Sequence, residues 1–265
     1  MDLGLAGKVA IITGGGEGIG YAAASRIAAE GGKVVIVGRR REILEQAATA
    51  IASEGAGEAL PIPIDITTPD AASRIVSAAH EAFGRVDILV NNAGVSMAKP
   101  FEQVTDQDWR ADFDLKLWAA IALAREVIPH MRARGGGRIV NVTNLDGRTP
   151  GAGKMPTSIA RAAGIAFTKG LSKDLAADNI LVNTVCIGFI RSGQHERRFS
   201  RSANISDAAA LDGLYAKEAT QRGIPLGRVG DGAEAGDVIA FLASARASYV
   251  TGVAINIDGG LSAVV

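Results

Sequence analysis

The sequence lacks the features that would mark a disulfide-linked, membrane-embedded or nucleic-acid-binding protein. It contains one cysteine in 265 residues, so no internal disulfide can form. Lys and Arg, 28 in all, balance 28 Asp and Glu, and no global field attracts nucleic acid or an anionic membrane. No apolar run reaches the roughly 20 residues that span a bilayer, and no cationic region leads into an apolar segment at the amino terminus. We therefore expect a cytoplasmic protein with neither nucleic acid nor membrane as a partner.

The single cysteine, Cys186, lies in an apolar run over residues 180–187. Free cysteine is among the residue types that are most often buried. We therefore interpret Cys186 as a small buried strand residue rather than as a nucleophile.

What the sequence does contain is the rhythm of an α/β protein. It is 48% hydrophobic and 21% charged, which is enough to bury a full core. Short apolar runs alternate with longer stretches of helical period, a pattern typical of a parallel sheet with helices on both faces. The apolar runs predict strands over residues 9–13, 33–37, 59–64, 88–91, 138–142 and 181–185, with a seventh over 253–257. The longer stretches predict helices over residues 19–30, 41–54, 68–83, 106–134 and 156–178.

This order of elements predicts one domain over residues 1–265, an α/β fold with a Rossmann-type doubly wound parallel sheet of about seven strands. The longest stretch without strand rhythm covers residues 192–223. Because open α/β folds bind ligands at the carboxyl edge of the sheet, we expect this stretch to be an excursion over that edge.

A glycine-rich loop joins the first predicted strand to the first predicted helix. The segment Thr13-Gly-Gly-Gly-Glu-Gly-Ile-Gly20 follows an apolar strand and opens an Ala-rich helix, the context that a dinucleotide-binding loop requires. Glycine at positions 14, 18 and 20 permits a tight turn, close approach of a pyrophosphate to backbone amides, and close packing of helix on strand. The loop predicts a dinucleotide cofactor, with a plain structural turn as the alternative.

The end of the second predicted strand indicates which dinucleotide. In Val37-Gly38-Arg39-Arg40-Arg41, glycine stands where an acidic residue would disfavour a 2′-phosphate. Arginine can pair with that phosphate, so NADP(H) is favoured over NAD(H), with Arg39 as the candidate ligand. For any one of these arginines, a charged helix start that faces solvent is the alternative.

Over nearly its whole length the sequence resembles the short-chain dehydrogenase/reductase family. The resemblance rests on the glycine loop and on Asp65, Asn91-Asn-Ala-Gly94, Ile187-Gly-Phe-Ile-Arg-Ser192, Pro225-Leu-Gly-Arg228, Phe241-Leu-Ala-Ser244, Tyr249-Val-Thr-Gly252 and Asp258-Gly-Gly260. It implies an oxidoreductase that moves a hydride to or from a nicotinamide cofactor. The cofactor contacts that it implies are Gly14, Gly16, Glu17, Gly18, Ile19, Gly20, Arg39, Asp65, Ile66, Asn91, Ala93, Gly94, Arg161, Gly188, Ile190 and Ser192. No metal site is implied.

The resemblance also locates four catalytic positions, and this sequence departs from the family at each of them. The family uses a tyrosine as proton donor, a lysine that lowers its pKa, a serine that orients substrate and an asparagine that fixes a water relay. The matching residues here are Lys116 for asparagine, Asn144 for serine, Thr157 for tyrosine and Arg161 for lysine. Threonine is too short to reach the place of a tyrosine oxygen, and arginine stays protonated. Another group must supply the proton if the reaction is retained.

Three functions remain open on this evidence. We favour an atypical NADP(H)-dependent oxidoreductase that acts on a small carbonyl, alcohol, imine or activated alkene, with Lys116, His195 or Tyr215 as the replacement acid. Lys116 would have a depressed pKa beside Arg161, and Asp146 could pair with either cation. A non-redox lyase, hydratase or dehalogenase on the same fold is the second function. A catalytically silent cofactor-binding scaffold is the third.

Two further expectations concern partners. The excursion begins with a locally basic segment, residues 191–201, which could hold an anionic group of the substrate or form a solvated lid helix. The family resemblance implies a homo-oligomer, a tetramer or a dimer, with interfaces on the helices predicted over residues 106–134 and 156–178.

Overall fold

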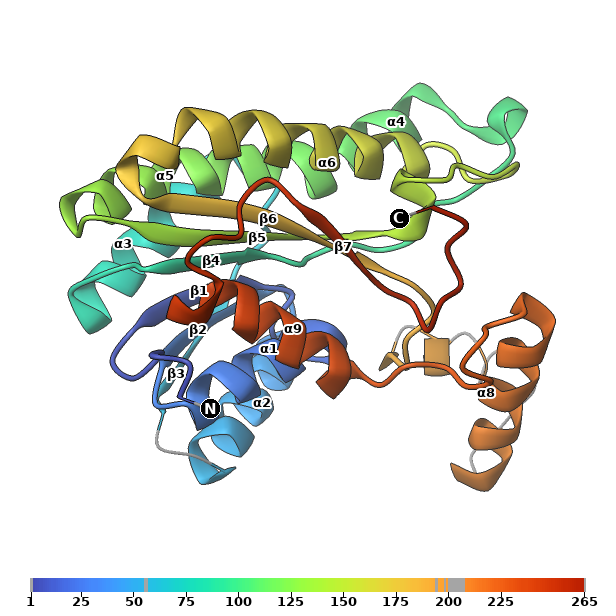
Figure 1. Ribbon diagram of the computed structural model, residues 1–265, viewed down its shortest axis with the longest axis horizontal. Coiled ribbons are helices and arrows are strands. Elements are labelled where there is room, and N and C mark those ends of the chain that lie inside the picture. Colours follow the sequence, from blue (N-terminus) through green and yellow to red (C-terminus); the bar gives the residue numbers. More distant parts are fainter. Residues whose placement is uncertain (1, 55–56, 194, 198, 200–207, 265) are drawn as a thin grey trace.

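A sheet of parallel strands forms the centre of the computed structural model (Figure 1), in the order β3-β2-β1-β4-β5-β6-β7. The strands are β1 (Val9–Thr13), β2 (Lys33–Gly38), β3 (Ala59–Pro63), β4 (Ile88–Asn91), β5 (Gly137–Asn144), β6 (Ile180–Ile187) and β7 (Ala254–Ile257). The structure describes residues 2–54, 57–193, 195–197, 199 and 208–264. The predicted single α/β domain with a doubly wound parallel sheet is confirmed.

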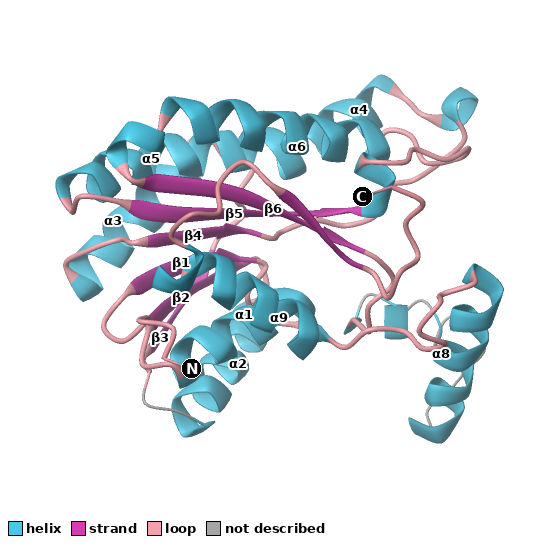
Figure 2. Cartoon of the chain, viewed as in Figure 1, coloured by secondary structure: helices cyan, strands magenta, loops and turns pink. Residues whose placement is uncertain are grey.

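Helices cover both faces of the sheet (Figure 2). One face carries α1 (Gly18–Ala29), α2 (Arg41–Glu54) and α9 (Gly232–Ala243), and the other carries α3 (Ala71–Phe83), α5 (Ala119–Ala133) and α6 (Thr157–Asp174). Helix α4 (Asp106–Phe113) packs beside α6. Side chains of a strand point alternately to the two faces. Ile12 of β1 therefore packs in the core on the α1 side, and its neighbour Ile11 packs in the core on the α3 side. Burial on both faces explains why the strands read as continuous apolar runs.

The predicted strands agree with the observed ones to within two residues at each end, whereas three of the predicted helices differ. The helix predicted over residues 68–83 begins at Ala71, because two turns precede it: the backbone N–H of Thr68 donates to the carbonyl oxygen of Asp65, and that of Ala71 to the carbonyl oxygen of Thr68. The helix predicted over 156–178 ends at Asp174, and a 3₁₀ turn follows at Ala176–Asp178. The long helix predicted over 106–134 is divided by a wider π-helical turn at Asp114–Trp118. This turn carries Lys116.

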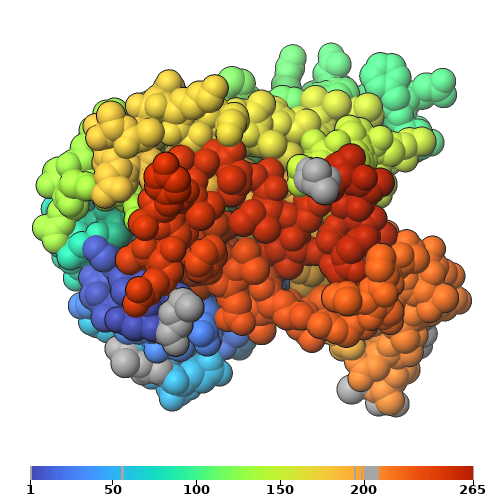
Figure 3. Space-filling model, viewed as in Figure 1, coloured from blue at the N-terminus to red at the C-terminus, as the bar shows by residue number. Residues whose placement is uncertain are grey.

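The excursion stands beyond the carboxyl edge of the sheet and contains α8 (Ala208–Arg222). In Figure 3, α8, in orange, projects from the body of the molecule. A separate hydrophobic cluster supports it, made by Phe189, Phe199, Tyr215, Ala219, Ile224 and Val229. No helix in the described part of the chain has both the length and the hydropathy that a membrane crossing needs.

Cys186 is fully buried in β6, as predicted. The hydroxyl of Thr143, on the neighbouring strand β5, donates a hydrogen bond to its sulfur at 3.3 Å. The thiol therefore fills a place in the core between two strands.

Candidate active site

A cavity of about 720 Å³ lies at the carboxyl ends of the strands, between the glycine loop and the start of the excursion. Its size falls within the range of small-molecule sites, roughly 300–1,000 Å³. The residues of the predicted cofactor set that line it are Gly14, Gly16, Glu17, Gly18, Ile19, Arg39, Asp65, Ile66, Ala93, Gly94, Arg161, Gly188, Ile190 and Ser192. Asn144 and Thr157 line it as well. The structure thus brings most of the predicted site to one cavity.

Three residues of the predicted site lie outside that cavity: Gly20, Asn91 and Lys116. A side chain at position 20 would overlap the carbonyl oxygen of Gly14, so Gly20 acts by permitting close packing of α1 on the loop. Asn91 donates a hydrogen bond to the side-chain oxygen of Asn141 at 2.9 Å. Together with Lys116 it lines a separate internal void of about 10 Å³.

The glycine loop is braced by two residues whose role the sequence did not reveal. Asn92 donates its side-chain amide to the carbonyl oxygens of Thr13, at 2.9 Å, and Gly14, at 3.2 Å. In return, the hydroxyl of Thr13 accepts the backbone N–H groups of Asn92 and Ala93. Thr13 opens the glycine loop and Asn92 belongs to the Asn91-Asn-Ala-Gly94 motif, but only the structure shows that these two motifs bind each other. The loop is therefore held in one conformation, with Gly14 at a φ of 65°.

Glu17 of the loop forms ion pairs with two arginines. Arg40 approaches one carboxylate oxygen at 2.6 Å, and Arg197 of the excursion contacts both oxygens, at 2.7 and 2.9 Å. These hydrogen bonds, first the one from Arg197, lower the pKa of Glu17. Arg39 also lines the cavity, but it makes no hydrogen bond or ion pair with any residue that the structure describes. Arg39 is thus the guanidinium at this end that is available to a ligand anion.

Asp65 lies on the same side of the cavity as Arg39. Its carboxylate accepts hydrogen bonds from the backbone N–H of Thr67, at 3.0 Å, and from the Thr67 hydroxyl, at 2.8 Å. These bonds, and to a smaller extent the charge of Arg39, lower the pKa of Asp65. The carboxylate is therefore ionised and oriented at neutral pH.

Arg161, on α6, lines the cavity beside β5, whereas Arg39 follows β2 on the other side of β1 and β4. One terminal nitrogen of Arg161 donates to the carbonyl oxygen of Val142 at 2.7 Å, and the other lies against Gly94, where a side chain would come within 2.5 Å of it. Burial lowers its pKa to about 10. Arg161 remains charged at neutral pH, so it provides a fixed positive charge rather than a proton.

Lys116 lies behind the cavity wall with a side chain that is 0% exposed. Its ammonium group pairs with Asp112, which is also fully buried, and lies 3.4 Å from the hydroxyl of Thr157. Burial is the main reason that the pKa of Lys116 falls to about 8, and the charge of Arg161 lowers it further. The predicted lowering is present, but burial contributes more than the repulsion from Arg161 that the sequence suggested.

Thr157 is the residue that connects Lys116 to the cavity. Its hydroxyl donates to Asp112 at 3.3 Å and accepts the backbone N–H of Met97 at 3.1 Å. Asp112 was not identified from the sequence. Its one available signal was the spacing of four residues from Lys116, which places two helical side chains on one face.

The prediction that Asp146 pairs with Lys116 or Arg161 is wrong. Asp146 instead accepts the side-chain amide of Asn144 at 3.1 Å, and Lys154 is its cationic neighbour at 3.7 Å. Asp146 lies in a short 3₁₀ turn after β5, where its partners are Asn144 and Lys154 rather than the two cations. Its role is to orient the Asn144 side chain.

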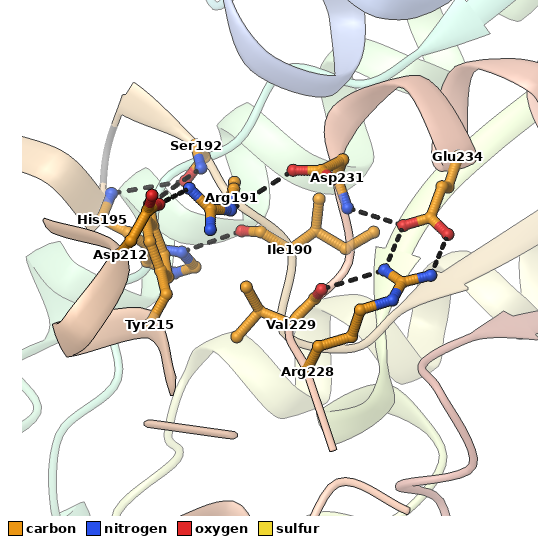
Figure 4. Close-up of polar contacts among 10 residues, drawn as sticks. All are labelled: Ile190, Arg191, Ser192, His195, Asp212, Tyr215, Arg228, Val229, Asp231 and Glu234. Atoms are coloured by element: carbon orange, nitrogen blue, oxygen red, sulfur yellow. Dashed lines mark hydrogen bonds and ion pairs between the residues drawn. The ribbon is translucent and has the colours of Figure 1, made fainter. Parts of the chain in front are cut away.

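The excursion places one of its two candidate acids, His195, beside Ile190 and Ser192 (Figure 4). His195 lines the cavity, stacks on Phe189 and has Nδ1 3.0 Å from the carbonyl oxygen of Ile190. Tyr215 is 1% exposed within the excursion's own cluster and accepts the backbone N–H of Ser192 at 3.4 Å. It does not line the cavity, so this placement argues against Tyr215 as the acid.

Two arginines of the basic segment are already matched by carboxylates. Arg191 pairs with Asp212 at 2.6 Å and with Asp231 at 3.3 Å, and Arg197 pairs with Glu17. Arg198 and Arg201 lie outside the described residues. No group of three His, Cys, Asp or Glu side chains that could hold a metal ion occurs within the described ranges.

Comparison with known sequences agrees with the resemblance that the motifs indicated. The profile of the short chain dehydrogenase family matches residues 8–203. The chain is 32% identical over 261 residues to 3-oxoacyl-[acyl-carrier-protein] reductase FabG from Aquifex aeolicus (strain VF5), an alignment that covers 98% of this chain and 100% of the relative.

Solved structures show the same similarity in three dimensions. L-sorbose reductase from Gluconobacter frateurii, complexed with NADPH and L-sorbose, has a TM-score of 0.92 and 32% identity, with 100% of both chains covered. An NADPH-bound short chain oxidoreductase from Pseudomonas aeruginosa PAO1, described as containing an atypical catalytic center, has a TM-score of 0.87 and 31% identity. That comparison covers 97% of this chain and 98% of the other.

Proposed function

This chain belongs to the short-chain dehydrogenase/reductase family, and from that premise we propose that it is an atypical NADP(H)-dependent oxidoreductase acting on a small carbonyl, alcohol, imine or activated alkene. Asn144, Thr157, Arg161 and Lys116 occupy its catalytic positions. The observation that carries the proposal is that Thr157 lines the cavity and contacts, behind it, a buried lysine with a depressed pKa. A cofactor site and a proton source thus lie in contact.

The cavity fits a dinucleotide. The braced glycine loop offers backbone amides to a pyrophosphate, and Arg39, which no described residue pairs with, offers its charge to a 2′-phosphate. Asp65 and Ile66 would contact the adenine, Arg161 the ribose, and Ile190 and Ser192 the nicotinamide amide. When bound, the cofactor would supply or accept a hydride. The two NADPH-bound relatives support the choice of NADP(H).

The proton reaches the substrate through Thr157 in this proposal. In the direction of reduction, the Thr157 hydroxyl gives its proton to the substrate atom that gains negative charge; because threonine is shorter than tyrosine, that atom would have to lie deeper in the cavity, against Thr157. It recovers a proton from the ammonium group of Lys116, which lies 3.4 Å away and becomes a neutral amine. An acid with a pKa of about 8 is suited to proton donation near neutral pH. Arg161 stays charged and stabilises the developing anion.

The excursion over residues 192–223 would act as the substrate lid. The bidentate pair of Arg197 with Glu17 joins it directly to the glycine loop. We also expect a homo-oligomer, a tetramer or a dimer. Trp118 and Ile159, on the Asp114–Trp118 turn and on α6, are 56% and 37% exposed. Large exposed apolar side chains of this kind are typical of protein interfaces.

The proposal is tested by NADPH oxidation with a panel of small carbonyls, imines and activated alkenes. Turnover with at least one class is expected, with loss of turnover in Lys116→Met and Thr157→Val. Tight NADPH binding without oxidation by any class would favour the silent cofactor-binding protein. A product formed without consumption of cofactor would favour the non-redox enzyme.

A further inference from the structure

We propose that Asp112 is the positioning residue of this site, which holds Lys116 and Thr157 together as one hydrogen-bonded unit and keeps Lys116 charged. The inference rests on the proposed function, because it assigns a role to the proton path described there. Asp112 itself does not line the cavity, so it acts through its two partners.

The contacts of Asp112 converge on one oxygen. Oδ1 accepts both the ammonium group of Lys116 and the hydroxyl of Thr157, the latter at 3.3 Å. The side chain comes from α4 and reaches Lys116 one helical turn later, across the start of the π-helical turn. A single carboxylate oxygen therefore fixes the position of the proposed proton donor relative to the residue that would pass the proton on.

The environment of the second Asp112 oxygen, Oδ2, indicates that the buried carboxylate serves the site rather than the stability of the fold. The side chain is 0% exposed, and Oδ2 has no hydrogen-bond partner among the described residues. A buried polar atom without a partner destabilises the folded state. A buried ion pair is commonly no better for stability than apolar side chains of similar size. Stability alone therefore gives little reason for a carboxylate here.

The charges around Lys116 make Asp112 decisive for its protonation. Arg161 on α6 adds a second positive charge, and the internal void beside Lys116 is lined by the neutral side chains of Asn91 and Asn141 but by no acidic residue in the described part of the chain. Asp112 is the counter-charge that opposes the effects of burial and of Arg161. Without it, Lys116 would lie buried beside another cation and would release its proton at lower pH.

Asp112 also directs the hydroxyl of Thr157. The backbone N–H of Met97 and the ammonium group of Lys116 both donate to that oxygen, which leaves the hydroxyl hydrogen for one acceptor. In the present arrangement it points to Asp112. Proton transfer in the proposed path would require the hydroxyl to turn from Asp112 toward the cavity, with Lys116 in place to replace the proton.

The first test measures the protonation of Lys116 directly, and it requires no substrate. Protein labelled with ¹³C at lysine Cε is titrated by NMR, with Lys116→Met used to assign the resonance. In the wild type, Lys116 is expected to titrate with a pKa of about 8. In Asp112→Asn, which keeps the shape of the side chain but removes its charge, the titration midpoint of Lys116 is expected to be lower by about 1 pH unit or more. An unchanged midpoint in Asp112→Asn would overturn the proposal.

The second test uses turnover. Asp112→Asn is expected to lower kcat about fivefold or more at pH 8 and to move the basic limb of the pH profile to lower pH, while the Kd of NADPH stays within about twofold. If Asp112→Asn does not fold, Asp112→Leu combined with Lys116→Met removes both buried charges and is expected to fold and to match Lys116→Met alone. A further tenfold loss in that combination would contradict a role through Lys116. A shifted NMR midpoint with no turnover in any variant would refute the proposed reaction and leave the role of Asp112 standing.

Discussion

Arg39 should decide the choice between the two dinucleotides, and Arg39→Ala tests this without knowledge of the substrate. Arg39 lines the cavity and is not held by a carboxylate within the described residues, whereas Arg40 is held by Glu17 at 2.6 Å. A hydrogen bond to a charged group contributes about 1.5–3 kcal/mol. Because Arg39 is exposed to solvent, we take the lower part of that range, which corresponds to a loss of roughly tenfold in NADPH affinity.

The assay is isothermal titration of wild type and variants with NADPH and with NADH. Arg39→Ala should weaken NADPH binding about tenfold and leave NADH binding unchanged within about twofold, and added salt should reduce the difference. Arg41→Ala is the matched control, since Arg41 pairs with Glu45 on α2 and does not line the cavity. An equal loss for both dinucleotides in Arg39→Ala, or no loss for NADPH, would refute the reasoning.

Three further predictions follow from the packing and the ion pairs. Gly20→Ala should lower the free energy of unfolding by about 1–3 kcal/mol in chemical denaturation, because its methyl group would overlap the Gly14 carbonyl. Gly170→Ala is the control: Gly170 lies in α6 with open space around it, so this substitution should raise the free energy of unfolding by about 0.4–1 kcal/mol. Equal changes in the two variants would contradict the packing argument. Arg197→Met should speed release of NADPH about threefold in stopped-flow displacement, because it frees the excursion from Glu17. Arg132→Met, which breaks a remote pair with Asp178, should leave the release rate unchanged. An unchanged rate in Arg197→Met would contradict a lid role for the pair of Arg197 with Glu17. Trp118→Glu should reduce the oligomeric mass in light scattering, and an unchanged mass would exclude this surface from the interface.

The sequence predicted the sheet closely because its strands are short, apolar and buried on both faces. β1 and β4 match their predicted bounds at both ends. The break at Asp114–Trp118 could not be predicted, because its residues, Asp-Leu-Lys-Leu-Trp, include no glycine or proline that would interrupt a helix. The prediction did not include helix α9, although its composition, rich in Ala and Gly, is similar to that of α1, which was predicted.

The two halves of the candidate site differ in how well they could be predicted. The glycine loop and Arg39 follow one another along the chain, so spacing alone places them near each other. The contact of Lys116 with Thr157 joins residues 41 positions apart, and it depends on how α6 packs on the π-helical turn. Asp146 is nearer in sequence to Asn144 than Asp112 is, and this proximity led to the wrong counter-ion. Contacts between elements, rather than within them, determine this part of the site.

The most direct test of the account is the pH dependence of NADPH oxidation in wild type and Lys116→Met. Lys116 donates its proton as the ammonium ion, which is present below its pKa of about 8 and lost above it. The wild-type kcat should therefore fall as the pH rises through about 8, and Lys116→Met should lose about 100-fold in kcat together with that limb of the profile. Retention of the same rate and the same limb in Lys116→Met would contradict the proposed proton path.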